Sequence, residues 1–202
     1  MTKVIIFGTF LVSILALYRQ NVGSLLLFNP FLIYHRREWH RLITHGFVHA
    51  DWWHLIINMF VLYSFGTAVE NKFNELAYYK VLIFPGLVFI GFYFSWIIVS
   101  SLNTLRKHRN DINYKSVGAS GAVSAVVFAG IFFEPLRKIY FYGIIGLPGI
   151  IIGILYLVYS FYMSRRSGDN INHDAHFIGA IYGFIFPLIL DFKLAKLFIG
   201  QF

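Results

Sequence analysis

Long runs without a charged residue divide this chain, and they constrain its fold more than any other feature of the sequence. Between successive Asp, Glu, Lys or Arg residues six of these runs cover 4–18, 52–69, 81–105, 116–133, 139–164 and 175–190. About 20 apolar residues cross the hydrocarbon core of a bilayer, so we interpret the runs as membrane spans. Apolar residues make up 58% of the 202 and charged residues only 13%, which leaves little chain for a separate soluble domain.

The spans are predicted to be helices. A membrane-spanning strand must belong to a closed barrel and alternate apolar with polar residues, and runs such as 149–152 do not alternate. The sequence therefore predicts an all-α, polytopic membrane protein with one six-helix domain over 1–202. The expected helices are approximately 4–27, 52–70, 77–104, 117–133, 138–163 and 174–191. We expect the first to be a retained anchor, because no small-residue cleavage site follows Tyr18.

The connectors indicate which partners to expect. The connector over 19–51 is long and rich in Phe, Leu and Trp, so we expect it to lie in the membrane interface. The net charge is +8, but the 17 basic residues are spread over the connectors, as in membrane flanks. This pattern favours the lipid bilayer and not nucleic acid as a partner. The absence of Cys excludes a thiolate nucleophile and Cys-ligated zinc.

Among the polar residues inside the predicted spans, where an unpaired polar side chain costs several kcal/mol, three groups stand out. They are His54 with Asn58, Ser120 within 118–121, and His176 within 175–179. In an up-and-down bundle the second, fourth and sixth helices begin on the same side of the membrane. All three groups lie at those beginnings, each within roughly 10 Å of one surface at a rise of about 1.5 Å per residue. The sequence therefore predicts one polar cluster near that surface.

The residue types of this cluster suit nucleophilic catalysis. A serine hydroxyl becomes a good nucleophile when a neighbouring base takes its proton, and neutral histidine is the usual base. Ser120 and His176 are candidates for this pair. Asp174 lies about 200° around the helix from His176, so we expect it to cap the sixth helix and not to act as a third catalytic member.

Attack of a serine on a carbonyl creates an oxyanion, and hydrogen-bond donors for it are also available. His54 and Asn58 are four residues apart and share a helical face, and the backbone N–H of Ser120 lies at a helix start. Gly118 and Gly121 permit close approach to this backbone.

Small residues are placed to bring the fourth and sixth helices together. They are Gly121, Ala125 and Ala129 on one face of the fourth helix and Gly179 and Gly183 on one face of the sixth.

Each motif has a purely structural alternative when it is taken alone. The stretch 118–121 fits a helix-packing motif with an incidental serine, His54 and Asn58 fit interhelical hydrogen bonding, and His176 fits a core histidine. A metal centre is a further alternative, because His45 and His49 are four apart. No carboxylate accompanies them at a metalloprotease spacing, so we expect no metal, and we expect both histidines to hydrogen-bond the long connector.

The sequence resembles the rhomboid family of intramembrane serine proteases at these residues. Residues 38–45 resemble the first-loop motif, 54–58 the second-helix motif, 118–121 the nucleophile motif, and 175–179 with Gly183 the sixth-helix motif. The chain resembles the minimal six-helix form of the family.

The resemblance implies residue roles, a substrate class and the absence of a cofactor. Ser120 is the implied nucleophile, His176 the general base and acid, and His54 and Asn58 the oxyanion donors beside the Ser120 amide. Arg41, Gly118, Gly121 and Gly179 are the implied structural supports. The implied substrates are single-pass transmembrane proteins cut near their helix ends. The alternative is a catalytically silent relative that binds membrane helices, and the sequence does not determine the oligomeric state.

Two departures from the family pattern and one conflict affect these expectations. His40 stands where the family often has Trp, and Ser124 stands where it often has an aromatic residue four positions after the nucleophile. We expect the missing ring to loosen the stacking that orients His176. The resemblance implies a bacterial inner membrane with the N-terminus in the cytoplasm and the site opening outward. The positive-inside rule favours the reverse, because ten of the 17 Lys and Arg residues lie on the cluster's side.

Overall fold

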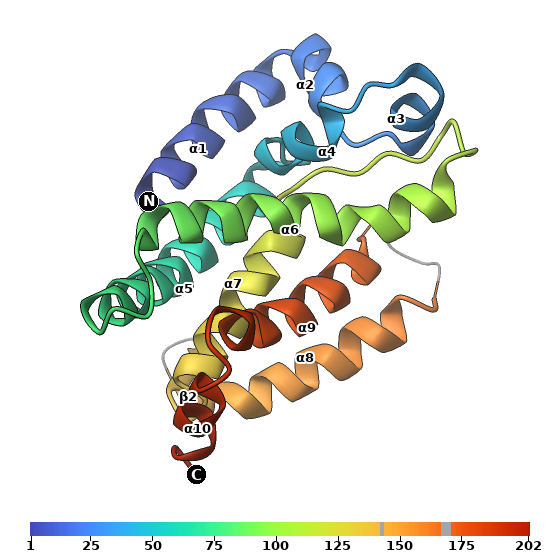
Figure 1. The fold of residues 1–202 in the computed structure, drawn as a ribbon. Coiled ribbons are helices and arrows are strands. Elements are labelled where there is room, and N and C mark those ends of the chain that lie inside the picture. The colour runs from blue at the N-terminus through green and yellow to red at the C-terminus, as the bar shows by residue number, and fades with distance from the viewer. Residues whose placement is uncertain (142–143, 167–170) are drawn as a thin grey trace.

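The computed structural model describes residues 1–141, 144–166 and 171–202, which are predominantly helical. The longer helices of the bundle (Figure 1) are α1 (Thr2–Tyr18), α5 (Trp52–Tyr78), α6 (Pro85–His108), α7 (Ser120–Phe133), α8 (Gly149–Met163) and α9 (His173–Leu190). Short helices complete the chain: α2 (Gln20–Leu26), α3 (Pro30–Arg36), α4 (Arg41–Thr44), the 3-10 turn η1 (His45–Phe47) and α10 (Leu194–Ile199). The prediction of an essentially all-α fold is confirmed.

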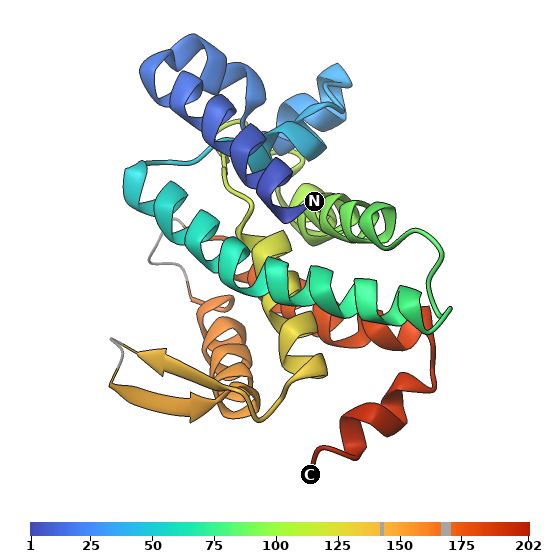
Figure 2. The ribbon, with the colours of Figure 1, turned by 90° about the vertical axis from the view of Figure 1, so that its left-hand side faces the viewer.

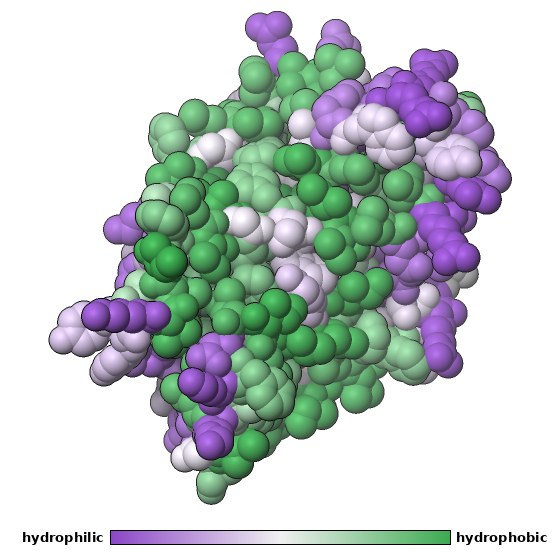
Figure 3. All heavy atoms as spheres, viewed as in Figure 1, coloured by the Kyte–Doolittle hydropathy of each residue, from purple (hydrophilic) through white to green (hydrophobic). Residues whose placement is uncertain are grey.

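Among the described residues, three helices are long and apolar enough to cross a membrane by themselves, namely α5, α6 and α9. Three shorter apolar helices, α1, α7 and α8, accompany them. Six spans therefore stay a prediction, as does the single domain over 1–202. Apolar side chains cover most of the face seen in Figure 3, and hydrophilic ones gather toward two opposite edges of it, as expected for a bundle embedded in lipid.

The first three expected helices have different bounds in the structure. The predicted helix over 4–27 breaks at Arg19, whose backbone is extended, so that α1 and α2 are separate helices. The second helix continues eight residues past the predicted end at 70, because its charged residues find partners: Glu70 pairs with the N-terminal ammonium, and Lys72 lies 3.1 Å from Glu75. The third begins at Pro85 and not at 77, since proline suits the first position of a helix.

A β-hairpin replaces the first part of the helix predicted over 138–163. Strand β1 (Lys138–Phe141) pairs antiparallel with β2 (Ile145–Pro148), and α8 begins only at Gly149 (Figure 2). Residues 142–143 of the predicted helix lie outside the described residues. The backbone N–H of Gly149 donates to the carbonyl of Arg137 at 2.9 Å and closes the base of the hairpin. Pro148 lacks the N–H that a helix interior requires, which is a physical reason for the late start.

The core of the molecule surrounds α7. This helix packs against α5, α6, α8 and α9, and most of its residues are buried. Toward the end opposite the polar cluster, the ring of Phe73 from α5 lies 6.2 Å from those of Phe89 on α6 and Phe186 on α9. Ser120 is therefore the first residue of the most enclosed of the described helices.

Candidate active site

Ser120 and His176 lie within hydrogen-bond distance of each other. Ser120 is the first residue of α7, His176 lies in the first turn of α9, and Ser120 Oγ is 2.7 Å from His176 Nε2. Such a distance suits a hydrogen bond between a hydroxyl and an imidazole nitrogen. The arrangement permits proton transfer from the hydroxyl to the ring.

The start of α9 is tied down by Asn172 and not by Asp174, contrary to our prediction. The Asn172 side-chain oxygen accepts the N–H of Ala175 at 3.1 Å, and its amide donates to Thr104 of α6 at 2.9 Å. Asparagine is among the preferred capping residues, and Asn172 occupies the capping position itself. Asp174 lies in the first turn and faces Lys107 at 3.7 Å. These contacts fix the helix end that carries His176.

Glycine contacts bring α7 and α9 together. A Cβ atom on Gly179 would overlap the backbone carbonyl of Gly121, and one on Gly183 would overlap the carbonyl of Ala125. The two backbones therefore approach more closely than side chains allow. This approach places the beginnings of both helices, and hence Ser120 and His176, side by side.

His54 lies against the turn that precedes Ser120. Gly118 has a φ of 108°, and a Cβ atom added there would lie 2.7 Å from Cε1 and 2.9 Å from Nε2 of the His54 ring. Asp51 caps α5 by accepting the His54 N–H at 2.7 Å. Only glycine satisfies both the backbone angle and the space at 118.

Asn58 lies one turn further along α5 and is buried. One N–H of its amide donates to the carbonyl of His54 at 2.8 Å, within the same helix. An amide carries two N–H donors, so the second is left for another acceptor. The described contacts do not join Asn58 directly to Ser120.

Two histidines of the long connector make hydrogen bonds, His45 within the connector and His49 to α1. His45 Nδ1 lies 2.8 Å from the carbonyl of Arg41, and the His45 carbonyl accepts the N–H of Gly118 at 3.0 Å. His49 Nδ1 lies 2.9 Å from the Ser13 hydroxyl. Desolvation by burial lowers the pKa of His45 to about 4. Burial, and then the neighbouring His54, lower the pKa of His49 to about 3. Both rings are therefore neutral at pH 7.

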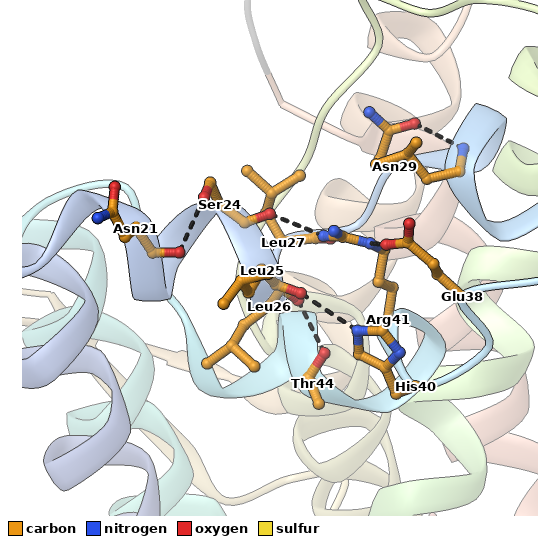
Figure 4. Close-up of polar contacts among 11 residues, drawn as sticks. Asn21, Ser24, Leu25, Leu26, Leu27, Asn29, Glu38, His40, Arg41 and Thr44 are labelled. Atoms are coloured by element: carbon orange, nitrogen blue, oxygen red, sulfur yellow. Dashed lines mark hydrogen bonds and ion pairs between the residues drawn. The ribbon is translucent and has the colours of Figure 1, made fainter. Parts of the chain in front are cut away.

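Arg41 organises the connector from inside (Figure 4). Its side chain is buried; Nε donates to Glu38 at 2.7 Å, and Nη1 donates to the carbonyls of Ser24 at 2.8 Å and Leu27 at 2.9 Å. Thr44 adds a bond of 2.8 Å to the carbonyl of Leu26. The α2 region is thereby held to α4, which leads directly to His45.

Sequence reasoning missed Tyr156 of α8. Ser124 does lack a ring, but the Tyr156 ring lies near His176, with centroids 6.4 Å apart and planes at 23°. The Tyr156 hydroxyl is 2.6 Å from the Ser124 hydroxyl. An aromatic ring from α8 therefore lies beside His176, and the expected loosening of the stacking stays a prediction. No local pattern distinguishes this residue from the other tyrosines of the chain.

Among the described residues, no group of three or more His, Asp or Glu side chains is arranged to hold a metal ion. The expectation of a metal-free and cofactor-free site stays a prediction.

Comparison with known proteins identifies the class to which this fold and site belong. The rhomboid domain matches residues 36–191, and the chain belongs to the rhomboid family of membrane proteins.

Individual relatives come from both organelles and bacteria. The chain is 30% identical over 145 residues to RHOMBOID-like protein 12, mitochondrial, of Arabidopsis thaliana, covering 70% of this chain and 43% of the relative. It is 29% identical to Rhomboid protease GluP of Bacillus subtilis, over 80% of this chain and 28% of the relative. For Putative rhomboid protease YdcA, also from Bacillus subtilis, the identity is 27%, over 75% of this chain and 67% of the relative.

The chain spans less than two thirds of the length of several of these proteins. A bacterial cell membrane is not supported over an organellar one, because mitochondrial and chloroplastic relatives also match.

Proposed function

We propose that this protein is an intramembrane serine endopeptidase that cleaves single-pass transmembrane proteins with a Ser120–His176 dyad. The observation that carries the proposal is the 2.7 Å hydrogen bond between a hydroxyl and an imidazole from two different helices. Two of the matched relatives are named as a rhomboid protease and a putative rhomboid protease, which supports the same activity.

In the proposed reaction Ser120 Oγ attacks the carbonyl carbon of the scissile peptide bond while His176 Nε2 takes the hydroxyl proton. The tetrahedral intermediate collapses, the C–N bond breaks, and His176 returns the proton to the leaving amine. Water then attacks the acyl-Ser120 ester while His176 takes a proton from it. The bond between the acyl carbon and Ser120 Oγ breaks, His176 returns the proton to Oγ, and the second product leaves. The dyad needs no acidic member, and Asp174 faces Lys107.

Three donors are proposed for the oxyanion: the backbone N–H of Ser120, the ring of His54 and the amide of Asn58. The Ser120 N–H belongs to the first turn of α7, where backbone donors lack partners inside the helix. The His54 ring lies against Gly118, two residues before the nucleophile. The second N–H of Asn58 is the proposed third donor.

A fluorophosphonate probe tests the proposal directly. We expect labelling of the wild type that disappears in Ser120→Ala and in His176→Ala. Ser64→Ala serves as a matched control, because the Ser64 hydroxyl donates to the carbonyl of Phe60 within its own helix. Cleavage of single-pass helices in liposomes, with mass-spectrometric mapping of the cut, identifies substrates. A wild type that neither reacts nor cleaves but retains transmembrane helices would instead favour the helix-binding alternative.

For the topology we propose a cytoplasmic N-terminus and a site that opens on the opposite side. Asn113 lies in the loop between α6 and α7, on the side of the site, and Asn74 lies near the end of α5 on the other side. Both residues are exposed, and the chain contains no Cys. We expect a membrane-impermeant maleimide to reach Asn113→Cys only from the exterior and Asn74→Cys only from the cytoplasm. The reverse pattern would overturn the proposed orientation.

A further inference from the structure

Tyr156 links the helix that carries Ser120 to the helix that carries His176. Its ring is nearly parallel to the His176 imidazole, at 23°, with the centroids 6.4 Å apart. Its hydroxyl is 2.6 Å from the hydroxyl of Ser124 on α7. Ser124 lies four residues after Ser120 and thus on the same face of α7, one turn deeper. Contacts therefore connect α7, α8 and α9 in a ring that consists of Ser120, His176, Tyr156 and Ser124.

The surroundings of Tyr156 favour a fixed ring position. Ser124 is buried, and the ring of Phe128, one further turn along α7, lies 5.7 Å from that of Tyr156. Three residues beyond, Tyr159 presents its ring edge to His173 of α9 at 5.6 Å. The cluster-side part of α8 thus places two tyrosines against two histidines of α9.

We propose that Tyr156 is a positioning residue that holds the His176 ring in the orientation that directs Nε2 at Ser120. The inference rests on the proposed protease function. A histidine side chain turns about two bonds, and the Ser120 hydrogen bond restrains the ring at Nε2. A parallel ring beside it resists tilting of the plane, and the Ser124 bond fixes that ring relative to α7. Geometric errors of about 1 Å at a reacting group can lower a rate by about 100-fold.

One consequence distinguishes this arrangement from a site built on α7 and α9 alone. The positioning ring belongs to α8, whose hydroxyl link to α7 is a single side-chain contact. Displacement of α8 removes the ring from His176 without separating α7 from α9. The catalytic geometry is therefore complete only while α8 packs against both helices.

Two substitutions at Tyr156 distinguish the contribution of its ring to the rate from that of its hydroxyl. Tyr156→Leu keeps apolar bulk but removes the ring, and we expect kcat to fall by about 10- to 100-fold with KM little changed. Tyr156→Phe keeps the ring, and we expect it to recover most of the lost kcat. Tyr162→Leu is the matched control, because Tyr162 lies on the same helix, is exposed and packs on Arg166. Unfolding in detergent, followed for each variant, checks that the fold is intact.

A double-substitution cycle tests the link through Ser124. Ser124→Ala and Tyr156→Phe remove opposite ends of one hydrogen bond, so we expect the double variant to be no slower than the slower single variant. Additive losses, a change confined to KM, or a kcat of Tyr156→Leu equal to that of wild type would each overturn the inference. In these cases wild type still cleaves, so the protease proposal stands. A wild type that does not label at Ser120 and does not cleave overturns both.

Discussion

Two regions hold Ser120 in place by opposite means. The connector between α1 and α5 is held by polar side chains, with the buried Arg41 bonded to Glu38 and to two backbone carbonyls. It contacts the turn before Ser120 through the His45 carbonyl, which accepts the Gly118 N–H. The contact between α7 and α9 depends instead on Gly179 and Gly183, whose missing side chains let backbone approach backbone.

Because the two regions are held by different contacts, we expect them to respond to different substitutions and conditions. A buried charge that loses its partners is costly, so the connector responds to changes of charge and protonation. A close backbone crossing responds to added volume and is indifferent to pH. The turn before Ser120 depends on the polar contacts of the connector. The distance between Ser120 and His176 depends on the close crossing of α7 and α9.

The largest expected effect comes from breaking the polar support. Arg41→Ala leaves Glu38 without its ion-pair partner and two backbone carbonyls without a donor, and we expect a loss of about 3–5 kcal/mol in the free energy of unfolding. Unfolding in mixed micelles, followed by tryptophan fluorescence, measures it. Arg36→Ala, at an exposed arginine of the same connector, is the control and should be near neutral. Equal stability of the two variants would contradict the assigned role of Arg41.

A variant that changes neither the connector contacts nor the helix crossing distinguishes an effect on catalysis from an effect on folding. Asn58→Ala removes a proposed oxyanion donor, and we expect the cleavage rate to fall by about 10- to 1,000-fold with little change in unfolding. Asn74→Ala, exposed on the same helix, should cleave normally. Wild-type activity in Asn58→Ala would remove this residue from the oxyanion site.

Added volume at the crossing of α7 and α9 is expected to push the two helices apart. Gly179→Ala places a methyl group onto the Gly121 carbonyl, and we expect a stability loss of about 1–3 kcal/mol together with slower labelling of Ser120. Gly91→Ala on α6 is the control, because no atom lies within 4 Å of the added Cβ. If Gly179→Ala labels as fast as Gly91→Ala, the close crossing is not what positions His176.

A smaller effect, the dependence of stability on pH, is expected from the connector and not from the helix crossing. His45 and His49 lie in the connector outside the spanning helices, and their pKa values in the folded protein are lowered from 6.5 to about 4 and about 3. The unfolded chain therefore binds more protons below pH 6.5, so the stability they confer is complete above that pH and is lost as the pH falls toward 3. We expect stability measured between pH 7 and pH 5 to decline less in the His45→Asn/His49→Gln double variant than in wild type. An unchanged slope would contradict the lowered pKa values.

Much of this protein could be predicted from residues that are close in sequence. Uncharged runs predicted an all-α membrane fold, and the regular chain direction of a bundle predicted that Ser120 and His176 lie near one surface. The structure adds their 2.7 Å separation. Helix bounds were less predictable, because Glu70 and Lys72 are stabilised in α5 by partners that include the distant N-terminus.

Two features depended on tertiary contacts alone. The segments 138–141 and 145–148 are apolar and were predicted to be helical, and the pairing of β1 with β2 and the closure at Arg137 show that they are strands. The aromatic neighbour of His176 comes from α8, 32 residues after Ser124. By itself the sequence determined which chemical groups are present and on which helix each lies, because charge and hydropathy act locally along the chain. Tertiary structure decided which ring lies beside His176, because that depends on how closely three helices pack.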